Sequence, residues 1–290
     1  MNFSENLIKS YKEAKVFQEL SQLNCIDYLY DGTSFGVSTN DTLKIYCPIR
    51  GILYNTIHIP QLRKFIFLFK NTILHSTENY IKYLSLYDNQ YIRSFKCEKV
   101  KSLSSNINND LFLSSSNDCV NVWDLRCKNS IYKLSVNDSI VSFSSNNKFC
   151  VNVGDSLVKQ YDMRNVTYGP EKTIYFDGHD EITGIQYSND SKNIIISSNN
   201  IHTVVSAETG KVKYNHCFDK VSYACASPDS KYLFCTSGSH VFVYGIDDKK
   251  KVHTFKDSNF EHGLIKCNPA YTQFVTASTS VVFWMPPQDV

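Results

Sequence analysis

The stretch Leu111-Phe-Leu-Ser-Ser-Ser-Asn-Asp-Cys-Val-Asn-Val-Trp123-Asp124-Leu-Arg126 contains two short apolar runs, at 111–113 and 120–123. Asn117 and Asp118 lie between them, and such side chains favour tight turns because they hydrogen-bond to nearby backbone and tolerate the left-handed conformation. Two apolar runs joined by such a turn predict a β-hairpin. The hairpin ends in a Trp-Asp dipeptide, which provides a marker that can be sought elsewhere in the chain.

Six weaker copies of this hairpin precede and follow it. The residues that take the place of Trp123 are Tyr46, Tyr87, Tyr161, Val205, Tyr244 and Trp284. Successive markers are separated by 41, 36, 38, 44, 39 and 40 residues, which matches the period of WD40 repeats. We therefore predict an all-β fold, a seven-bladed WD40 β-propeller in which each blade is a four-stranded sheet stacked on its neighbours.

The two ends of the chain predict how the ring closes. Pro286-Pro287 follows Trp284 directly and cannot continue a hydrogen-bonded ladder, so the last blade lacks an outer strand. Lys15–Glu19 is a spare strand candidate at the other end. We expect this N-terminal strand to join the last blade, so that residues 14–287 form a single propeller. Residues 1–13 are expected to be a leader that is either disordered until bound or frayed.

Composition excludes several classes of protein. The formal net charge is only +2, which does not suit a protein that binds nucleic acid through bulk charge. No run approaches the 18 apolar residues of a membrane-spanning helix, and the first residues lack a signal-peptide core. Ten cysteines are scattered without a CxxC pair, as expected for buried thiols in a reducing compartment. We expect an intracellular protein that contacts neither a membrane nor a specific nucleic-acid sequence.

Sequence motifs of enzymes are not found. The chain contains no GxGxxG, GxxxxGK[ST], HExxH or GxSxG pattern, so we expect no catalytic residues and no cofactor. The segment Asp177-Gly-His-Asp-Glu181 could be read as a metal site or as a solvated turn between blades. We favour the turn and predict no metal.

Several segments are more specific than WD40 repeats in general. They are Tyr83–Phe95, Trp123–Arg126, Tyr161–Arg164, Thr183–Asp190 and Phe274–Pro286. Together they resemble the WD repeat-containing protein 82 family, over about residues 14–287. The resemblance implies a non-enzymatic nuclear scaffold subunit of a COMPASS-type histone lysine methyltransferase, of a transcription-termination phosphatase complex, or of both. The implied partners are a SET-domain methyltransferase subunit, a phosphatase-targeting subunit and the phosphorylated tail of RNA polymerase II.

Propeller topology predicts which loops share a face. Turns between the second and third strands of a blade lie on the same side as connections that enter the next blade. The candidate partner-binding residues on this side are Arg63, Lys64, Tyr80, Lys96 and Lys99 in blades two and three, and Phe260 and His262 in blade seven. Asp177, Asp180 and Glu181 lie on the same face in blade five. The basic group is either a site for an acidic or phosphorylated peptide or part of an ordinary mixed surface.

Two successive blades end in the pattern W/Y-D-x-R, as Asp124 with Arg126 and Asp162 with Arg164. This double motif resembles that of WD40 substrate receptors for cullin-four ubiquitin ligases, which use it to dock an adaptor. Alternatively, each Asp pairs with its Arg at the strand end and braces adjacent blades. A substrate receptor of this kind is therefore the alternative function.

Overall fold

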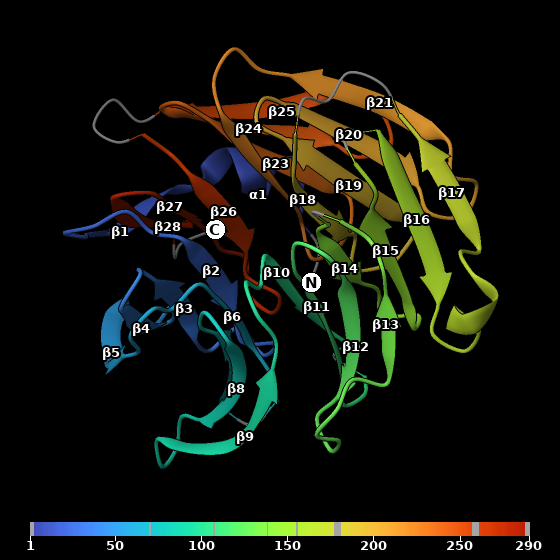
Figure 1. Ribbon diagram of the computed structural model, residues 1–290. Coiled ribbons are helices and arrows are strands. Elements are labelled where there is room, and N and C mark those ends of the chain that lie inside the picture. The colour runs from blue at the N-terminus through green and yellow to red at the C-terminus, as the bar shows by residue number, and fades with distance from the viewer. Residues whose placement is uncertain are drawn as a thin grey trace.

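The structure, a computed structural model, describes residues 3–69, 71–106, 108–137, 139–154, 156–176, 181–256 and 261–287. Its strands form seven four-stranded antiparallel sheets, arranged as blades around a common centre (Figure 1). The innermost strands of neighbouring blades contact one another in cyclic order, and that of the last blade contacts that of the first. The predicted seven-bladed WD40 β-propeller is confirmed.

Each blade is a meander of four strands. Blade one contains β2 (Cys25–Tyr28), β3 (Phe35–Ser38), β4 (Thr42–Cys47) and β5 (Ile52–His58). Blade two contains β6 (Lys64–Phe67), β7 (Thr72–Ser76), β8 (Tyr80–Ser85) and β9 (Gln90–Lys96), and blade three β10 (Ser102–Ser105), β11 (Leu111–Ser115), β12 (Val120–Asp124) and β13 (Tyr132–Leu134). Blade four contains β14 (Val141–Phe143), β15 (Lys148–Asn152), β16 (Leu157–Asp162) and β17 (Lys172–Tyr175), with a 3₁₀ turn η1 (Val166–Tyr168) before β17.

Blade five contains β18 (Ile182–Tyr187), β19 (Asn193–Ser198), β20 (Ile201–Ser206) and β21 (Val212–Cys217). Blade six contains β22 (Ser222–Ala226), β23 (Tyr232–Ser237), β24 (His240–Gly245) and β25 (Lys251–Lys256), and blade seven β26 (Leu264–Cys267), β27 (Phe274–Ala277) and β28 (Ser280–Met285). The second strand of each blade is almost wholly buried, because both faces of this strand pack against the neighbouring blades.

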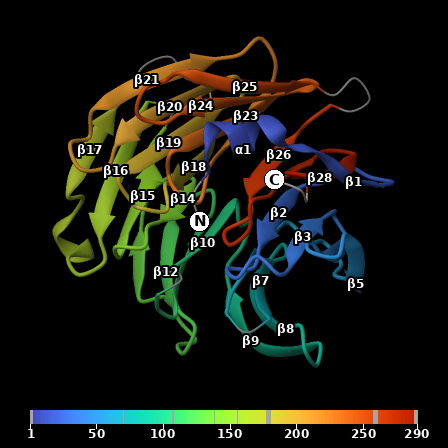
Figure 2. The same ribbon diagram turned by 180° about the vertical axis from the view of Figure 1, so that it is seen from behind.

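The ring closes as the ends of the sequence predict. Strand β1 (Lys12–Gln18) pairs antiparallel with β28 and is the fourth strand of blade seven. Both views show the two strands side by side (Figures 1 and 2). Phe17 contributes to the contact, since its ring packs against Tyr46 of blade one at 4.8 Å and against Phe283 at 6.0 Å between centroids.

The described part of the leader differs from the expectation for residues 1–13. Residues 5–10 form helix α1 (Glu5–Ser10), whose N-cap Ser4 accepts a hydrogen bond from the Leu7 amide at 3.2 Å, as N-cap residues do. Phe3, Ile8 and Tyr11 are buried in the core shared by blades six and seven. Their apolar side chains, recurring at helical spacing, hold this segment against the propeller.

The repeat marker in blade two also differs from the sequence prediction. Tyr87 is 93% exposed in the turn after β8. The residue equivalent to Trp123 is Leu84, which pairs with buried Ile73 as Trp123 pairs with Phe112. The amide two residues beyond Leu84 bonds to Asn71, matching the bond from Leu125 to Asp110 in blade three. The Tyr87-Asp88 dipeptide resembles the marker in sequence only. Leu84 is buried and is the residue that packs between blades.

Candidate partner-binding surfaces

Four of the five predicted basic-face residues lie around one turn. The turn at 77–79 joins β7 to β8, and its carbonyls accept hydrogen bonds from Cys97 and Lys99 at 3.1 and 2.8 Å. Tyr80 pairs with Lys96 across the outer two strands of the blade, and Arg63 bonds through its amide to the last residue of β7. The exposed side chains of Arg63, Tyr80, Lys96 and Lys99 are therefore brought onto one surface, here called the basic arc.

An acidic residue that the sequence analysis did not weigh lies inside the basic arc. The Glu78 carboxylate is 3.7 Å from the Arg63 guanidinium, and both side chains are about half exposed. An exposed pair at this distance contributes little to stability, but it reduces the positive charge of the arc. The topology that placed Tyr80 on this face would also have placed Glu78, which occupies the same turn.

Lys64 occupies a different environment from the other members of the predicted group. It is half-buried on innermost strand β6 and, with Lys101 and Lys266, lines a hollow of about 420 Å³ in the central channel. Lys266 forms an ion pair of 2.7 Å with Asp27 across the blade-seven to blade-one boundary. The mouth of the channel is thus cationic, and it opens beside the basic arc.

His262 is placed inside the protein and not on the predicted partner surface. Its side chain is 5% exposed, and its Nδ1 lies 3.1 Å from the Thr276 hydroxyl, which also accepts a 3.1 Å bond from the Trp284 indole. Blade three contains a related arrangement, in which Trp123 donates to Ser114 at 2.9 Å. Because it is buried, this histidine makes a structural contact between the entering loop and the second and third strands of its blade.

The remaining residues of this face are partly outside the described structure. Phe260, Asp177 and Asp180 fall on residues that the structure does not describe. Glu181 is exposed and lines a hollow of about 650 Å³ together with Lys101 and Lys159. Of the three predicted acidic residues, the structure therefore describes only Glu181, and two lysines line the same hollow.

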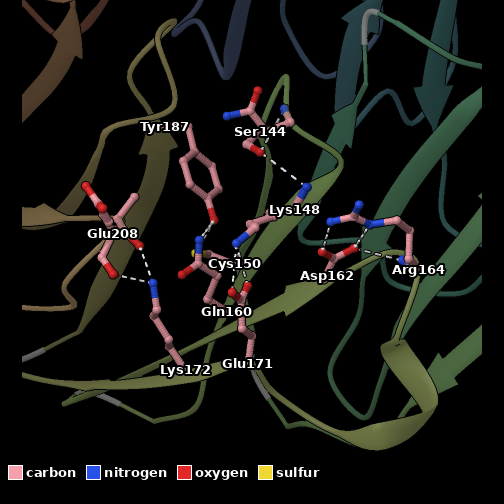
Figure 3. A network of polar contacts seen from close by, with 12 residues as sticks. Ser144, Lys148, Cys150, Gln160, Asp162, Arg164, Glu171, Lys172, Tyr187 and Glu208 are labelled. Atoms are coloured by element: carbon pink, nitrogen blue, oxygen red, sulfur yellow. Dashed lines mark hydrogen bonds and ion pairs between the residues drawn. The ribbon is translucent and has the colours of Figure 1, made fainter.

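The two W/Y-D-x-R motifs have the same geometry. The Asp124 carboxylate accepts bonds from the Arg126 amide at 2.8 Å and from its guanidinium at 2.9 and 2.6 Å. Asp162 and Arg164 repeat these bonds at 2.9, 3.0 and 2.6 Å (Figure 3). Hydrogen bonding by Arg164 lowers the pKa of Asp162 to about 2, and that by Arg126 lowers the pKa of Asp124. Local pairing at the strand end is thus observed in both blades.

The arginine that spans two blades at this place is Arg93, which the motif does not include. Its guanidinium, from β9 of blade two, donates to the carbonyl oxygen of Arg126 in blade three. The side chains of Arg126 and Arg164 are each 75% exposed. Both guanidiniums are therefore held in fixed orientations by their aspartates and remain accessible to a partner.

Within the described ranges, no three His, Cys, Asp or Glu side chains lie close enough together to hold a metal ion. No helix there has the length and apolar character needed to cross a membrane. The described surface offers instead a cationic arc, two paired arginines and, in blades one and two, a set of exposed apolar side chains.

Known proteins resemble this chain over nearly its whole length. A family model described as "WD domain, G-beta repeat" matches residues 89–124. "WD repeat-containing protein 82" of Drosophila melanogaster is 30% identical, over 98% of this chain and 97% of its own length. "Set1 complex component swd2" of Schizosaccharomyces pombe is 24% identical over 85% of this chain and 87% of its own. "COMPASS component SWD2" of Saccharomyces cerevisiae is 26% identical over 86% and 85%.

Proposed function

Since this chain belongs to the WD repeat-containing protein 82 family, we propose that it is a non-enzymatic scaffold subunit of a nuclear histone lysine methyltransferase complex. The observation that carries the proposal is its similarity to two fungal proteins named as components of the Set1 complex and of COMPASS, each over 85% or more of both chains. A match of that extent covers most of the propeller and not a single repeat.

The geometry supports a scaffold. Strand β1 closes the ring on β28, so every blade has two packed neighbours and the loops on both faces are carried by a rigid frame. Rigid elements position binding groups more accurately than isolated loops do. Partners would include a SET-domain subunit and, in a second assembly, a phosphatase-targeting subunit, each contributing an extended segment that lies along the propeller surface.

Affinity purification of the tagged chain from nuclei, followed by mass spectrometry, tests this function. We expect a SET-domain methyltransferase, with or without a phosphatase and its targeting subunit. Recovery of a cullin adaptor without either enzyme would overturn the proposal in favour of the alternative. Purification with the tag alone provides the background of non-specific proteins.

The basic arc is proposed as the site of an acidic or phosphorylated peptide, with the phosphorylated tail of RNA polymerase II as the candidate. Support comes from the three cations Arg63, Lys96 and Lys99, which are exposed on one surface beside the cationic channel mouth that includes Lys64. Phosphate groups pair strongly with such side chains. Glu78 lies within the arc, so a phosphate would also have to compete for Arg63.

Charge reversal distinguishes this site from an ordinary mixed surface. Arg63→Glu with Lys99→Glu should weaken binding of a phosphorylated tail peptide at least about tenfold, because two charge-assisted contacts become repulsive. The control is Lys192→Glu with Lys211→Glu, which changes the charge equally at exposed positions of blade five. If the two double variants bind the phosphorylated peptide equally well, the basic arc is part of an ordinary mixed surface and not the peptide site.

The alternative, a substrate receptor of a cullin-RING ubiquitin ligase, is favoured by one observation. Arg126 and Arg164 lie at equivalent positions of successive blades, and both side chains are 75% exposed. Replacement of both by alanine should abolish binding of a cullin-four adaptor while leaving the melting temperature within a few degrees. If the double variant binds the adaptor as well as the wild type does, or if the wild type does not bind it, these arginines serve only to pair with their own aspartates.

A further inference from the structure

Exposed apolar side chains are concentrated in blades one and two. Of the seventeen large hydrophobic residues that are exposed in the described structure, ten lie between Tyr30 and Ile92. They are Tyr30, Ile49, Ile52, Leu53, Tyr54, Phe69, Tyr80, Tyr87, Tyr91 and Ile92. Single exposed apolar residues need no explanation, but five of these ten line one hollow, and such a group is typical of an interaction site.

The outer strand of blade one is unusual among the seven. Strand β5, Ile52-Leu-Tyr-Asn-Thr-Ile-His58, contains no Asp, Glu, Lys or Arg, whereas each of the other six outer strands contains at least one. It has no strand on its outer side. Charged residues commonly protect such edges from pairing with other chains. Their absence leaves β5 with an uncharged edge that itself carries three of the exposed side chains, Ile52, Leu53 and Tyr54.

A groove of about 990 Å³ lies next to this edge, between blades one and two. Its walls include the exposed side chains of Tyr30, Ile49, Ile52, Tyr54 and Tyr87. Tyr30, Ile49 and Tyr87 come from turns that join first to second or third to fourth strands, and Ile52 and Tyr54 from the start of β5. The groove therefore opens on the face opposite to the basic arc. Tyr30 packs on the exposed Phe69 ring at 4.8 Å, which holds one aromatic wall in place.

The groove has two charged side chains among its described lining residues, Asp31 and Arg50. Oδ1 of the Asp31 carboxylate accepts bonds from the amide and hydroxyl of Thr33 at 2.9 and 2.7 Å, which holds this half-buried carboxylate in its own turn. Arg50 is exposed and forms no ion pair with any described residue. An apolar occupant with an acidic group would therefore match the groove better than a basic one.

We propose that the groove between blades one and two binds an extended, proline-containing segment of a partner protein that carries an acidic residue opposite Arg50. Grooves lined by aromatic rings accept such segments because a polyproline helix is already extended and loses little conformational entropy on binding. The three exposed tyrosines supply the ring faces, and Arg50 sets the direction of the segment. The site lies apart from the basic arc, so it does not depend on the peptide site proposed there.

The probe is a synthetic library of 12-residue peptides, each with two prolines three residues apart and each made in a glutamate and a lysine version. Binding to the isolated full-length chain is measured by fluorescence polarisation. We expect a subset to bind, with the glutamate versions roughly three- to fivefold tighter, as one partly exposed ion pair allows. Tyr54→Ala with Tyr87→Ala should weaken these peptides about tenfold or more, as loss of aromatic anchors does.

Two further variants sharpen the result. Arg50→Glu should reverse the preference, so that the lysine versions bind more tightly. Tyr168→Ala with Tyr175→Ala removes two equally exposed tyrosines from blade four and should change nothing. The proposal is overturned if no peptide distinguishes wild type from the Tyr54/Tyr87 variant, or if Arg50→Glu keeps the glutamate preference. It is also overturned if sedimentation shows a dimer that this double variant abolishes, because the occupant is then a second copy.

Discussion

Val16 of the first strand pairs with Val282 of the last, so the two ends of the chain share one blade. The pairing runs from Lys12 with Met285 to Gln18 with Ser280. The segment before it buries Phe3, Ile8 and Tyr11. Removal of the first strand would therefore open the ring and expose β28, whose residues Ser280–Met285 carry no charge.

Deletion of residues 1–20 should sharply lower the melting temperature. Loss of the buried leader side chains alone removes several kcal/mol, at roughly 1.5–3 kcal/mol for each large apolar residue, which corresponds to a fall of about 10 °C or more. Differential scanning fluorimetry and size-exclusion chromatography are the measurements, and aggregation through the β28 edge should accompany the fall. Leu20→Ser, at a fully exposed position, is the control. An unchanged melt of the deletion would contradict closure by β1.

The hydroxyl of Thr276 connects His262 with Trp284 in the interior of blade seven. Thr276→Val keeps the shape but removes both hydrogen bonds, so we expect a loss of about 2–4 kcal/mol in the free energy of unfolding, because two buried polar groups lose a partner. Thr276→Ser retains the hydroxyl and should cost only about 1 kcal/mol for the lost methyl group. Urea unfolding of the two variants provides the comparison, and equal losses would show that the bonds contribute little.

Two buried histidines should make stability depend on pH. Burial lowers the pKa of His75 and of His216 to about 4, with smaller contributions from Lys82 and Lys249, whereas a histidine in the unfolded chain titrates near 6.5. Between these values the unfolded chain binds more protons than the folded chain. The free energy of unfolding therefore falls as the pH falls from 6.5 to 4, by up to roughly 3 kcal/mol per histidine, and this contribution is constant above 6.5.

The variant His75→Phe isolates one of these histidines, since neither of its ring nitrogens has a hydrogen-bond partner among the described residues. Urea unfolding at pH 7.5, 5.5 and 4.5 should show a shallower loss of stability in this variant than in the wild type. His58→Gln, at an exposed position, is the matched control and should retain the wild-type slope. If the His75→Phe slope equals that of the control, His75 is not the titrating group.

The aspartates of the two W/Y-D-x-R motifs should matter more for stability than the arginines. Arg126 is 75% exposed, so Arg126→Ala should cost at most about 1 kcal/mol, and Arg164→Ala the same. Asp124 is nearly buried and also accepts the Arg126 amide, so Asp124→Ala should cost about 1–3 kcal/mol. Chemical unfolding of the single variants gives the order. The opposite ranking would indicate that the guanidiniums brace the blades.

Much of the fold could be predicted because each blade repeats the same local pattern. The hairpin around Trp123 specifies its own turn and strand lengths, and six approximate copies reveal the period. The prolines after Trp284 and the spare strand near Lys15 predict the closure. Errors arose where local sequence is ambiguous: Tyr87-Asp88 imitates the marker, and the leader has too few residues for its helical spacing to stand out. Ser4 and the apolar positions 3, 7, 8 and 11 were the available signals.

The sequence by itself determined the number of blades, the strand order and the face on which each loop lies, because these follow from short-range patterning and from chain connectivity. Only the tertiary structure decided which side chains of a loop are exposed. Arg63 and Lys99 face the solvent, whereas His262 turns inward to Thr276 and Lys64 lines the channel. The groove beside Tyr54 and Tyr87 also depended on it, since a groove forms between two blades and neither blade's sequence describes the space between them.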